Sequence, residues 1–289
     1  MKVLKISSKN AAYQKFEVLK TNRNKRHKYQ EFIIEGVRNI NQALENNWQI
    51  ISYIYSGQTQ LSGWAAALLQ DNPTATNYAL TSQLMAELSD KTDPSELMAI
   101  VKMQPPSPGQ GRLSQAPILA LVDRPSNKGN LGTLLRSCDA LGVQQLIITG
   151  HSVDIYDPEV IAASTGSFFK VPHIRMSANS DIDGYIEDLR KQYPGLKVIG
   201  TDEKGTQAIH DVDLTGPLLI MMGNEKDGLN RHLLDCCDIL AEIPMAQDRS
   251  ASSLNISCAA TVVFYEVSRQ RATTPSTLRV ATPPQRGIG

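Results

Sequence analysis

The sequence lacks any long hydrophobic run: no apolar stretch approaches the roughly 18 residues that a membrane-spanning helix needs. Its first residues, MKVLKISSKN, contain no apolar core of the kind found in a secretory signal peptide. Cysteine is scarce as well, and the four cysteines show no C-x-x-C spacing. We therefore expect a cytoplasmic protein with free thiols and no membrane partner.

A net charge is also missing, because the chain carries 29 basic and 29 acidic side chains. The charges are unevenly placed, however: residues 1–35 hold nine lysines and arginines but only three glutamates. Such an asymmetry indicates a polyanionic partner. The segment KTNRNKRHKY predicts RNA contacts through Lys20, Arg23, Lys25, Arg26 and Lys28. Taken alone, a solvated helix end is the commoner explanation for such a run.

What the sequence does contain is the composition of a globular protein, with 41% hydrophobic residues over 289 positions. This length allows two domains. Short apolar runs alternate with helical patterns from residue 32 to 101, which predicts a small α/β domain within residues 1–103. Residues 104–116 are rich in Pro, Gly, Ser and Gln and read as a linker. Residues 273–289 are rich in Pro and Thr and predict a flexible tail.

Between linker and tail, residues 117–272 alternate strand and helix patterns more regularly. The strands expected here are dense in apolar residues, which is typical of a parallel sheet covered on both faces. They are ILALVD (118–123), QLIIT (145–149), KVIGTD (197–202), PLLIMMG (217–223) and ILAEIP (239–244). The predicted fold class is therefore α/β, with a parallel-sheet C-terminal domain and a smaller N-terminal α/β domain.

The most informative segment is residues 243–271, where a strand stops at a proline and the corner Ser253-Leu254-Asn255 leads into a long helix. Leu254, Cys258, Thr261 or Val262, and Tyr265 recur at helical spacing, which predicts that this face of the helix is buried. Polar residues at the start of a helix meet its unpaired backbone N–H groups. The arrangement suits a small polar ligand held by backbone.

A second segment runs from Asp123 to Val143, after the strand ILALVD. Gly129 and Gly132 permit tight backbone, and Asn130 is the expected N-cap of the next helix. Arg136 follows six residues later, in the expected second turn. Helix starts of this kind attract anions. Neither a Walker motif nor a dinucleotide fingerprint is present, so from the residues alone an ordinary βα turn is the more common explanation.

In a third segment, LLIMMGNEKDGLN, an expected apolar strand is followed directly by Gly223, Asn224 and Glu225. Glycine at the end of a strand lets a ligand approach the backbone, and ligands of such sheets lie beyond the carboxyl ends of the strands. A simpler explanation for Glu225 is a carboxylate in the first turn of a helix, where it interacts favourably with the helix dipole.

Together, the three segments resemble the motifs of the SpoU/TrmH-type RNA 2'-O-ribose methyltransferases of the SPOUT superfamily. NKGNLGTLLR matches N-x-G-N-x-G-x-x-x-R, GNEKDGL matches GNE-x-x-GL, and IPM and SLN match the third motif. Lys128 stands where the family has proline, and the loop at 246–252 is longer than usual and lacks glycine. The segments FIIEGVRNINQAL and LSDKTDPSELMAIVKM resemble the substrate-binding domain, similar to ribosomal protein L30e, that precedes many of these enzymes.

The resemblance implies an S-adenosylmethionine-dependent RNA methyltransferase with a trefoil knot, a rare feature in proteins. It also implies a homodimer in which Arg136 of one subunit serves a site completed by the other. The implied catalytic residues are Asn130, Arg136, Glu225, Ser253 and Asn255, and Arg136 is also expected to contact RNA. The implied cofactor-binding residues are Thr201, Met222, Gly223, Asn224, Ile243, Met245, Ser253 and Leu254.

Two alternatives remain open at this point: a SPOUT enzyme that methylates a base, and a catalytically degenerate RNA-binding protein. The additional N-terminal domain favours rRNA over tRNA as the substrate. No metal is expected, because Cys236 and Cys237 lie beside His232 without a second cysteine pair. Cys258 is expected in the core, on the apolar face of the last helix.

Overall fold

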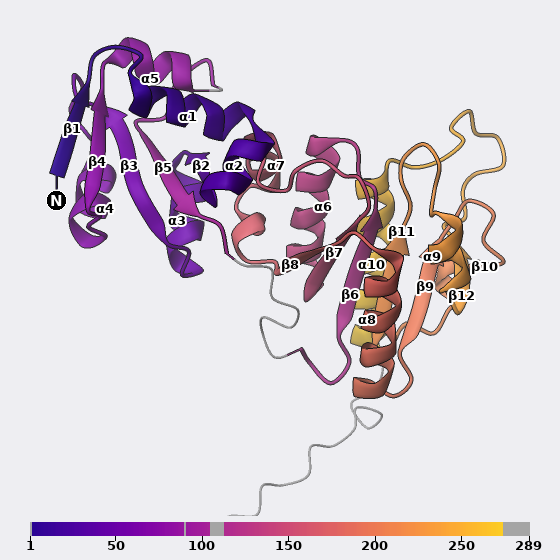
Figure 1. Ribbon diagram of the computed structural model, residues 1–289. Coiled ribbons are helices and arrows are strands. Elements are labelled where there is room, and N and C mark those ends of the chain that lie inside the picture. Colours follow the sequence, from indigo (N-terminus) through magenta and orange to yellow (C-terminus); the bar gives the residue numbers. More distant parts are fainter. Residues whose placement is uncertain (1, 90, 105–112, 274–289) are drawn as a thin grey trace, which may run out of the picture.

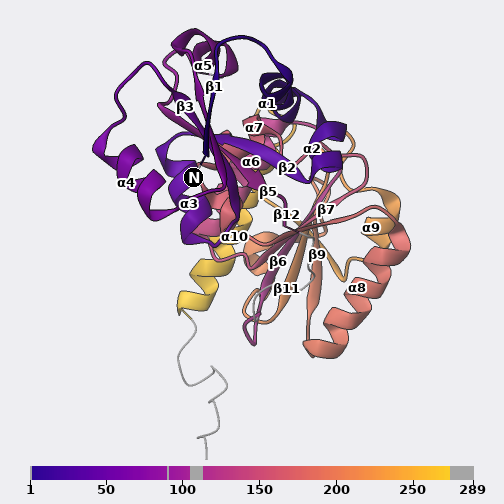
Figure 2. The same cartoon turned by 60° about the vertical axis from the view of Figure 1, so that its left-hand side comes forward.

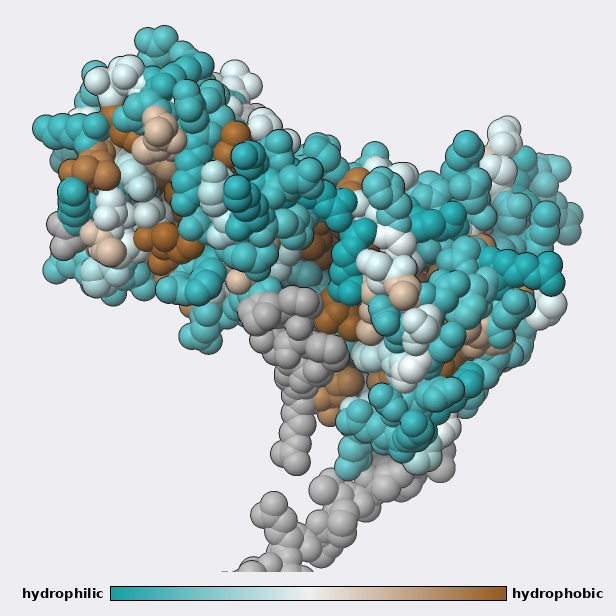
Figure 3. All heavy atoms as spheres, viewed as in Figure 1, coloured by the Kyte–Doolittle hydropathy of each residue, from teal (hydrophilic) through white to brown (hydrophobic). Residues whose placement is uncertain are grey.

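The computed structural model describes residues 2–89, 91–104 and 113–273 of the chain. The predicted flexible tail lies outside the described residues except for its first position, as does most of the predicted 104–116 linker. Figure 1 shows two lobes, one formed by the N-terminal part of the chain and one by the rest. Figure 3 shows that the face seen in this view is mostly hydrophilic on both lobes. Within the described residues, no helix combines the length and apolar character needed to cross a membrane.

The first lobe is a mixed five-stranded sheet in the order β1-β4-β3-β5-β2. The pairs β1–β4 and β3–β4 are parallel, whereas β5 runs antiparallel to both β3 and β2. Its elements are β1 (Lys2–Ile6), α1 (Ala11–Thr21), α2 (Arg23–Tyr29), β2 (Glu31–Glu35), α3 (Val37–Glu45), β3 (Ile50–Ser56), α4 (Gly63–Asp71), β4 (Thr76–Leu80), α5 (Ser82–Leu88) and β5 (Leu97–Lys102).

The second lobe is a seven-stranded sheet in the order β10-β12-β9-β11-β6-β7-β8, and every strand pair in it is parallel. Its elements are β6 (Ile118–Asp123), α6 (Lys128–Ala140), β7 (Gln145–Thr149), α7 (Pro158–Ser164), the 3-10 turn η1 (Ser167–Phe169), β8 (His173–Met176), α8 (Asn179–Gln192), β9 (Lys197–Thr201), β10 (Gln207–Ala208), the 3-10 turn η2 (Ile209–Asp211), β11 (Leu218–Met222), α9 (Arg231–Asp235), β12 (Ile239–Glu242) and α10 (Ile256–Thr273).

Helices cover both faces of this second sheet, as predicted. Every residue of β6, β7 and β11 is buried. Alternate residues point to opposite faces of a strand, so Ala120 and Ile220 join one hydrophobic cluster while Leu119 and Leu219 join another. The first cluster is covered by α6, α7 and α10, and the second by α8 and α9. Figure 2 shows α8 and α9 on one side of the sheet and α10 on the other.

The two lobes share a continuous apolar interface. Phe32 and Trp48 of the first lobe pack against Phe168 of the second, with ring centroids 5.6 and 5.3 Å apart. The Trp48 indole also donates a hydrogen bond of 2.9 Å to the backbone oxygen of Phe169. These rings belong to one buried cluster that spans both lobes. The lobes are therefore docked by packing as well as joined by the chain.

The last helix buries a different face from the one predicted. Its buried apolar side chains are Ile256, Ala260, Val263, Phe264 and Val267. The stripe expected in the core is exposed instead: Leu254 and Val262 are each 41% exposed and Tyr265 is 60% exposed. Cys258 is exposed as well, so its placement in the core was wrong. The helix carries two apolar faces, and only one of them packs on α6 and the sheet.

Candidate functional site

The carboxyl ends of four neighbouring strands meet at one edge of the second sheet. Met222 at the end of β11 pairs with Val122 of β6 on one side and with Thr201 of β9 on the other. Thr201 in turn pairs with Ala241 of β12. The residues that follow these strands, including Gly223 and Ile243, therefore begin at one place, which is where parallel α/β sheets bind ligands.

A chain of side-chain hydrogen bonds joins the three segments singled out in the sequence. The Asn255 amide donates to Asn130 Oδ1 over 3.0 Å. The Asn130 amide donates to Glu225 Oε1, also over 3.0 Å, and Ser126 Oγ donates to Glu225 Oε2 over 3.1 Å. The start of α10, the first turn of α6 and the loop after β11 thus converge on Asn130.

The helix caps explain why Asn130 is available for this role. The expectation that Asn130 caps α6 was wrong, because α6 begins at Lys128 and its N-cap is Asn127, whose side chain accepts from the Asn130 backbone. Asn255 does occupy a helix start: its Oδ1 accepts from the Ser257 backbone N–H over 3.0 Å. The Asn130 side chain is therefore free to bridge two loops rather than satisfy its own helix.

Glu225 is held as a carboxylate. Burial raises its pKa, but hydrogen bonds from Asn130, from its own backbone and from Ser126 outweigh burial, so that the pKa is lowered overall. An anion that accepts two side-chain hydrogen bonds is a weak proton acceptor near neutral pH. Glu225 therefore suits the positioning of Asn130 better than proton transfer.

Gly223 and Asn224 shape the loop after β11. A Cβ atom on Gly223 would lie 2.2 Å from the carbonyl carbon of Gly228, so any side chain there would collide with backbone. Asn224 and Gly228 exchange two backbone hydrogen bonds of 3.0 Å. The Asn224 side chain donates to the backbone oxygen of Arg124 over 2.6 Å, which ties this loop to the one after β6. Asn224 therefore uses both its backbone and its side chain to hold the shape of these loops.

Sequence reasoning missed a buried acid beneath these loops. Asp123 is fully buried and accepts hydrogen bonds from the Arg124 guanidinium, Thr149 Oγ1 and the Asn230 backbone at 2.9, 2.8 and 3.0 Å. Arg124 has a left-handed φ of 48°, which turns the chain sharply after β6. The signal in the sequence was a lone aspartate closing an otherwise apolar strand, because a buried charge needs partners.

Most backbone groups of the segment from residue 243 to 254 form no hydrogen bond with the described residues. Among the described residues, no backbone–backbone hydrogen bond involves this loop, and one side chain, Arg249, bonds within it. Ile243 packs against the core, Met245 is half-buried, and Ser253 and Leu254 are exposed. A loop with free N–H and C=O groups beside the ends of β9 and β11 fits a ligand held by main-chain atoms.

Arg136 lies apart from the Asn130 network. It falls in the third turn of α6, not the second, because the helix begins at Lys128. Six residues along a helix turn a side chain roughly 120° away, so Arg136 and Asn130 point in different directions. Arg136 is exposed and forms no hydrogen bond or ion pair with the described residues. The next residue, Ser137, contacts Thr261 over 2.6 Å, so the part of α6 that carries Arg136 lies against α10.

The predicted RNA-contacting cations separate into two groups. Arg26 is only 1% exposed and pairs with Asp154 at 2.8 Å and Asp157 at 3.3 Å across the interface between the lobes. The prediction that Arg26 contacts RNA was therefore wrong, because its buried guanidinium pairs with acids of the other lobe. Arg23 also reaches the second lobe, donating to the Ser152 backbone oxygen over 2.9 Å.

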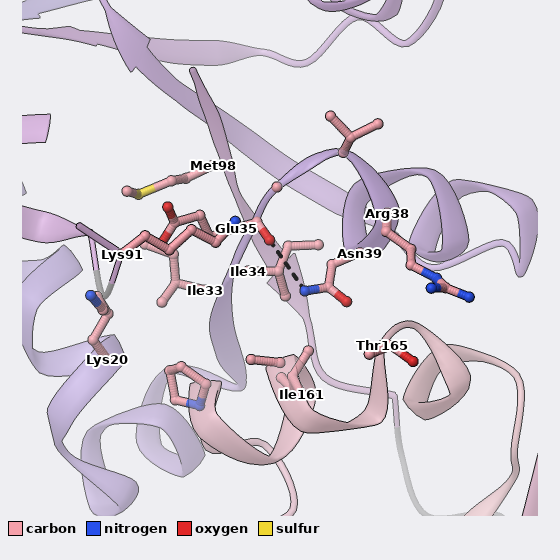
Figure 4. Close-up of a pocket in the computed structure, with 14 residues that line it drawn as sticks. Lys20, Ile33, Ile34, Glu35, Arg38, Asn39, Lys91, Met98, Ile161 and Thr165 are labelled. Atoms are coloured by element: carbon pink, nitrogen blue, oxygen red, sulfur yellow. Dashed lines mark hydrogen bonds between the residues drawn. The ribbon is translucent and has the colours of Figure 1, made fainter. Parts of the chain in front are cut away.

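The remaining cations are more accessible. Lys25 is half-buried, Lys28 is exposed, and neither forms an ion pair within the described part of the chain. Lys20 donates to the Leu88 backbone oxygen and lines a cavity of about 320 Å³ between the lobes. Figure 4 shows Lys20 and Lys91 at one end of this cavity, with Ile33 and Ile161 along it and Arg38 pointing away. The cavity is distinct from the Asn130 network.

Comparison with known proteins agrees with this architecture. Residues 117–265 match the family model of the SpoU rRNA methylase family, and residues 10–99 match that of the SpoU L30e-like domain. The chain is 39% identical to the 23S rRNA (uridine(2479)-2'-O)-methyltransferase of Streptomyces viridochromogenes over 277 residues, which cover 94% of this chain and 96% of the relative.

Solved structures are similar along almost the whole chain. The SpoU methyltransferase AviRb from Streptomyces viridochromogenes, in complex with AdoMet, superposes with a TM-score of 0.86 at 38% identity, over 92% of this chain and all of the other. An AdoMet-bound rRNA methyltransferase from Sinorhizobium meliloti gives 0.79 at 25% identity, over 92% and 98% of the two chains. The convergence of the three motifs and these matches lead to one conclusion: the chain belongs to the SpoU rRNA methylase family.

Proposed function

We propose that this protein transfers a methyl group from S-adenosylmethionine to a ribose 2'-hydroxyl of ribosomal RNA. The observation that carries the proposal is the hydrogen-bonded chain Asn255–Asn130–Glu225 at the carboxyl edge of the second sheet. Relatives of similar length bear the names of 23S rRNA 2'-O-methyltransferases, and related structures hold AdoMet. Since the substrate belongs to ribosomes, we place the reaction in the cytoplasm.

The cofactor would supply an activated methyl group on its sulfonium, so the protein has mainly to bind and orient. We assign its binding to the strand ends and to the loop with unpaired backbone, which together form a main-chain cradle. The residues are Thr201, Met222, Gly223, Asn224, Ile243, Met245, Ser253 and Leu254. We also infer the family's trefoil knot, because residues 117–265 match the SpoU rRNA methylase family.

Asn130 is placed to orient the ribose. Its amide is fixed by Glu225 on one side and by Asn255 on the other, so its rotamer is set before any substrate arrives. Such positioning can supply about 7–11 kcal/mol of the barrier when the reactants are held in a near-attack geometry. Ser253 is exposed at the same corner and is proposed to contact the substrate.

We propose that Arg136 acts on the site of a partner subunit in a homodimer. Arg136 lies on a different side of α6 from Asn130, and α6 packs on α10, whose outer face carries an exposed apolar stripe of Leu254 just before the helix, Cys258, Val262 and Tyr265. A second copy packed on this stripe would bury apolar surface that is exposed to solvent in the single chain. It would also bring Arg136 to the neighbouring pocket, where a planar guanidinium can clamp an RNA phosphate.

We assign residues 1–103 to RNA binding and residues 117–272 to catalysis. Lys25 and Lys28 of α2 are the accessible members of the predicted basic segment, and they lie on the lobe that matches the L30e-like domain. Lys20 and Lys91 at the cavity between the lobes add positive charge near the same surface. Cations at a protein surface neutralise phosphates. We favour rRNA over tRNA because the chain carries this additional lobe.

Nucleoside mass spectrometry tests the proposal. Ribosomal RNA from cells that lack the gene is incubated with the full chain and isotopically labelled S-adenosylmethionine, and then digested to nucleosides. We expect the label in a 2'-O-methyl nucleoside, and none with the Asn130→Ala variant. Asn179→Ala, which changes an exposed residue of α8, serves as the matched control and is expected to retain activity. A label on a base, or no label from well-folded protein that binds the cofactor, would contradict the assignment.

A further inference from the structure

Three side chains outside the proposed active site converge on the face of the second sheet that α8 and α9 cover. Asp183 lies in the second turn of α8, His232 in α9, and Cys236 is the residue that caps α9. His232 and Cys236 are four residues apart and so share one face of the helix. The Asp183 Oδ1, His232 Nε2 and Cys236 Sγ atoms all lie within 4.8 Å of one another.

The distances among the three atoms lie within about half an ångström of those in a tetrahedral zinc site. Asp183 Oδ1 is 2.8 Å from His232 Nε2 and 3.7 Å from Cys236 Sγ, and the histidine and cysteine atoms are 3.9 Å apart. Zinc–ligand bonds of about 2.0–2.3 Å at tetrahedral angles require separations of about 3.3–3.6 Å. Shifts of roughly half an ångström bring all three atoms into position. The Asp183 and His232 side chains are 46% and 33% exposed, so they are free to make such shifts.

The same geometry is unsuited to a nucleophilic triad. In a triad, the acid and the nucleophile contact different nitrogens of the imidazole ring. Here the carboxylate and the thiol both approach Nε2, as ligands of a shared ion would.

We propose that Asp183, His232 and Cys236 bind a zinc ion, with water as the fourth ligand. A thiolate, a carboxylate and a neutral imidazole would together balance the charge of the ion. This site uses only one cysteine of the adjacent pair Cys236 and Cys237. The spacing of cysteines in the sequence therefore did not predict it. Cys237 turns the other way and donates to the Leu233 backbone oxygen over 3.1 Å.

The ion would fasten α9 to α8, and α9 is linked to the active-site loops. Asn230 caps α9 and donates hydrogen bonds from both its backbone and its side chain to the buried Asp123. Asp123 also holds Arg124, whose backbone oxygen accepts from Asn224. A bound ion would therefore stabilise the loop after β11 from outside the site. The proposal concerns metal binding and stability and does not depend on the methyl-transfer reaction.

Metal titration of the full chain tests the site. Protein treated with a chelator and kept reduced by a phosphine is titrated with Co²⁺, followed by absorbance, and with Zn²⁺ against a chromophoric chelator. We expect one equivalent to bind, with a thiolate-to-cobalt charge-transfer band, and Zn²⁺ to raise the midpoint of urea unfolding. Cys236→Ser should abolish the band. Asp183→Asn and His232→Gln should weaken binding by at least about tenfold, since even changes around metal ligands cost about 10–100-fold.

Cys258→Ser is the control, because it removes a different thiol, on α10 and away from the three ligands. It should bind Zn²⁺ and Co²⁺ as the wild type does. Circular dichroism of each variant verifies folding, and the three side chains are exposed enough for conservative changes to be tolerated. The proposal is wrong if the wild type binds no ion, or if Cys236→Ser binds Zn²⁺ as tightly as the wild type and Cys258→Ser do.

Discussion

At the scale of single residues, the site depends on side chains that are fixed by hydrogen bonds before any ligand is present. Asn130 shows this most clearly, because Glu225 and Asn255 hold its amide from two sides. Arg136 contrasts with it, being exposed and unpaired among the described residues. Asn130 can therefore orient a substrate, whereas Arg136 offers an accessible positive charge that can bind an anion. Substitutions at the two positions should therefore fail in different ways.

Replacing Arg136 by lysine tests the phosphate clamp. Lysine keeps the charge but loses the planar fork that binds an anion through two parallel hydrogen bonds. We expect the single-turnover rate to fall by at least about tenfold, equivalent to about 1.4 kcal/mol, with cofactor affinity unchanged. Arg231→Lys, at a side chain that is 93% exposed on α9, should keep the wild-type rate. A near-normal rate for Arg136→Lys would rule out the clamp.

Gly223→Ala tests the backbone approach at the end of β11. The new methyl group would collide with the Gly228 backbone, so we expect a loss of about 1–3 kcal/mol in unfolding free energy and weaker cofactor binding by calorimetry. The matched control is Gly184→Ala in α8, where a Cβ meets nothing within 4 Å. That change should stabilise the protein by about 0.5–1 kcal/mol. Equal effects of the two substitutions would contradict the steric argument.

Part of the site could be predicted from the sequence, because the carboxyl ends of parallel strands meet at one edge of a sheet. Glycine and asparagine at the ends of apolar strands pointed to one edge of the sheet, and the structure joins Asn130, Glu225 and Asn255 there. The helix cap was misassigned to Asn130 because Asn127 and Asn130 are equally good cap formers in sequence. The role of Arg26 was beyond sequence reasoning, since a basic run does not indicate which of its members faces an acid on another lobe.

At the scale of elements, α10 is the most instructive. Its two apolar faces have different environments: Val263 and Phe264 are buried in the core, whereas Val262 and Tyr265 face outward. Helical periodicity identifies an apolar stripe but not what covers it. The strands were easier, because β6, β7 and β11 are apolar throughout and need cover on both faces. The strands β1, β8 and β10 were missed, since β1 is mostly exposed, β8 alternates buried with accessible residues, and β10 has only two residues.

Val262→Asp tests the proposed dimer. A carboxylate in an apolar interface is costly to bury, so we expect a monomer by light scattering where the wild type is a dimer, together with loss of methyl transfer. Val37→Asp offers a matched control, because Val37 is an exposed valine at the start of α3, 51% accessible and on the other lobe. It should leave the oligomeric state unchanged. A dimeric and active Val262→Asp variant would place the interface elsewhere.

Mixing two inactive variants tests whether Arg136 works across the dimer. A heterodimer of Arg136→Ala and Asn130→Ala subunits would contain one site with both residues intact, provided that they come from different chains. With random exchange, roughly a quarter of wild-type activity should return. Each variant alone stays inactive. Failure to regain activity in verified heterodimers would mean that Arg136 serves its own subunit.

At the scale of the whole molecule, the interface between the lobes combines apolar packing with paired charges. Arg26 is buried against two aspartates, and removing one partner of such a pair costs about 3–5 kcal/mol. His173 sits at the same interface, with its ring centroid 5.0 Å from that of Phe168. Burial lowers the pKa of His173 to about 4, against a hydrogen bond to the Val171 carbonyl that acts in the opposite direction.

The low pKa of His173 makes the fold sensitive to acid. Between about pH 6.5 and pH 4, the unfolded chain binds a proton at this residue that the folded chain does not. Stability should therefore be lost as the pH falls through this window. Urea unfolding at pH 7 and pH 5 should show a smaller loss for His173→Gln than for the wild type, while His151→Gln, at an exposed histidine, behaves like the wild type. Identical pH slopes for all three would refute the assignment.

The buried pairing of Arg26 with Asp154 and Asp157 also bears on how a target nucleotide is selected. Because this pairing holds the two lobes together, the fold sets the span from the basic helix α2 to the strand ends around Met222. An RNA gripped at one end would present for modification only the nucleotide lying at that fixed reach. The fold would then act as a ruler, choosing its target by distance along a folded RNA rather than by reading the bases nearby.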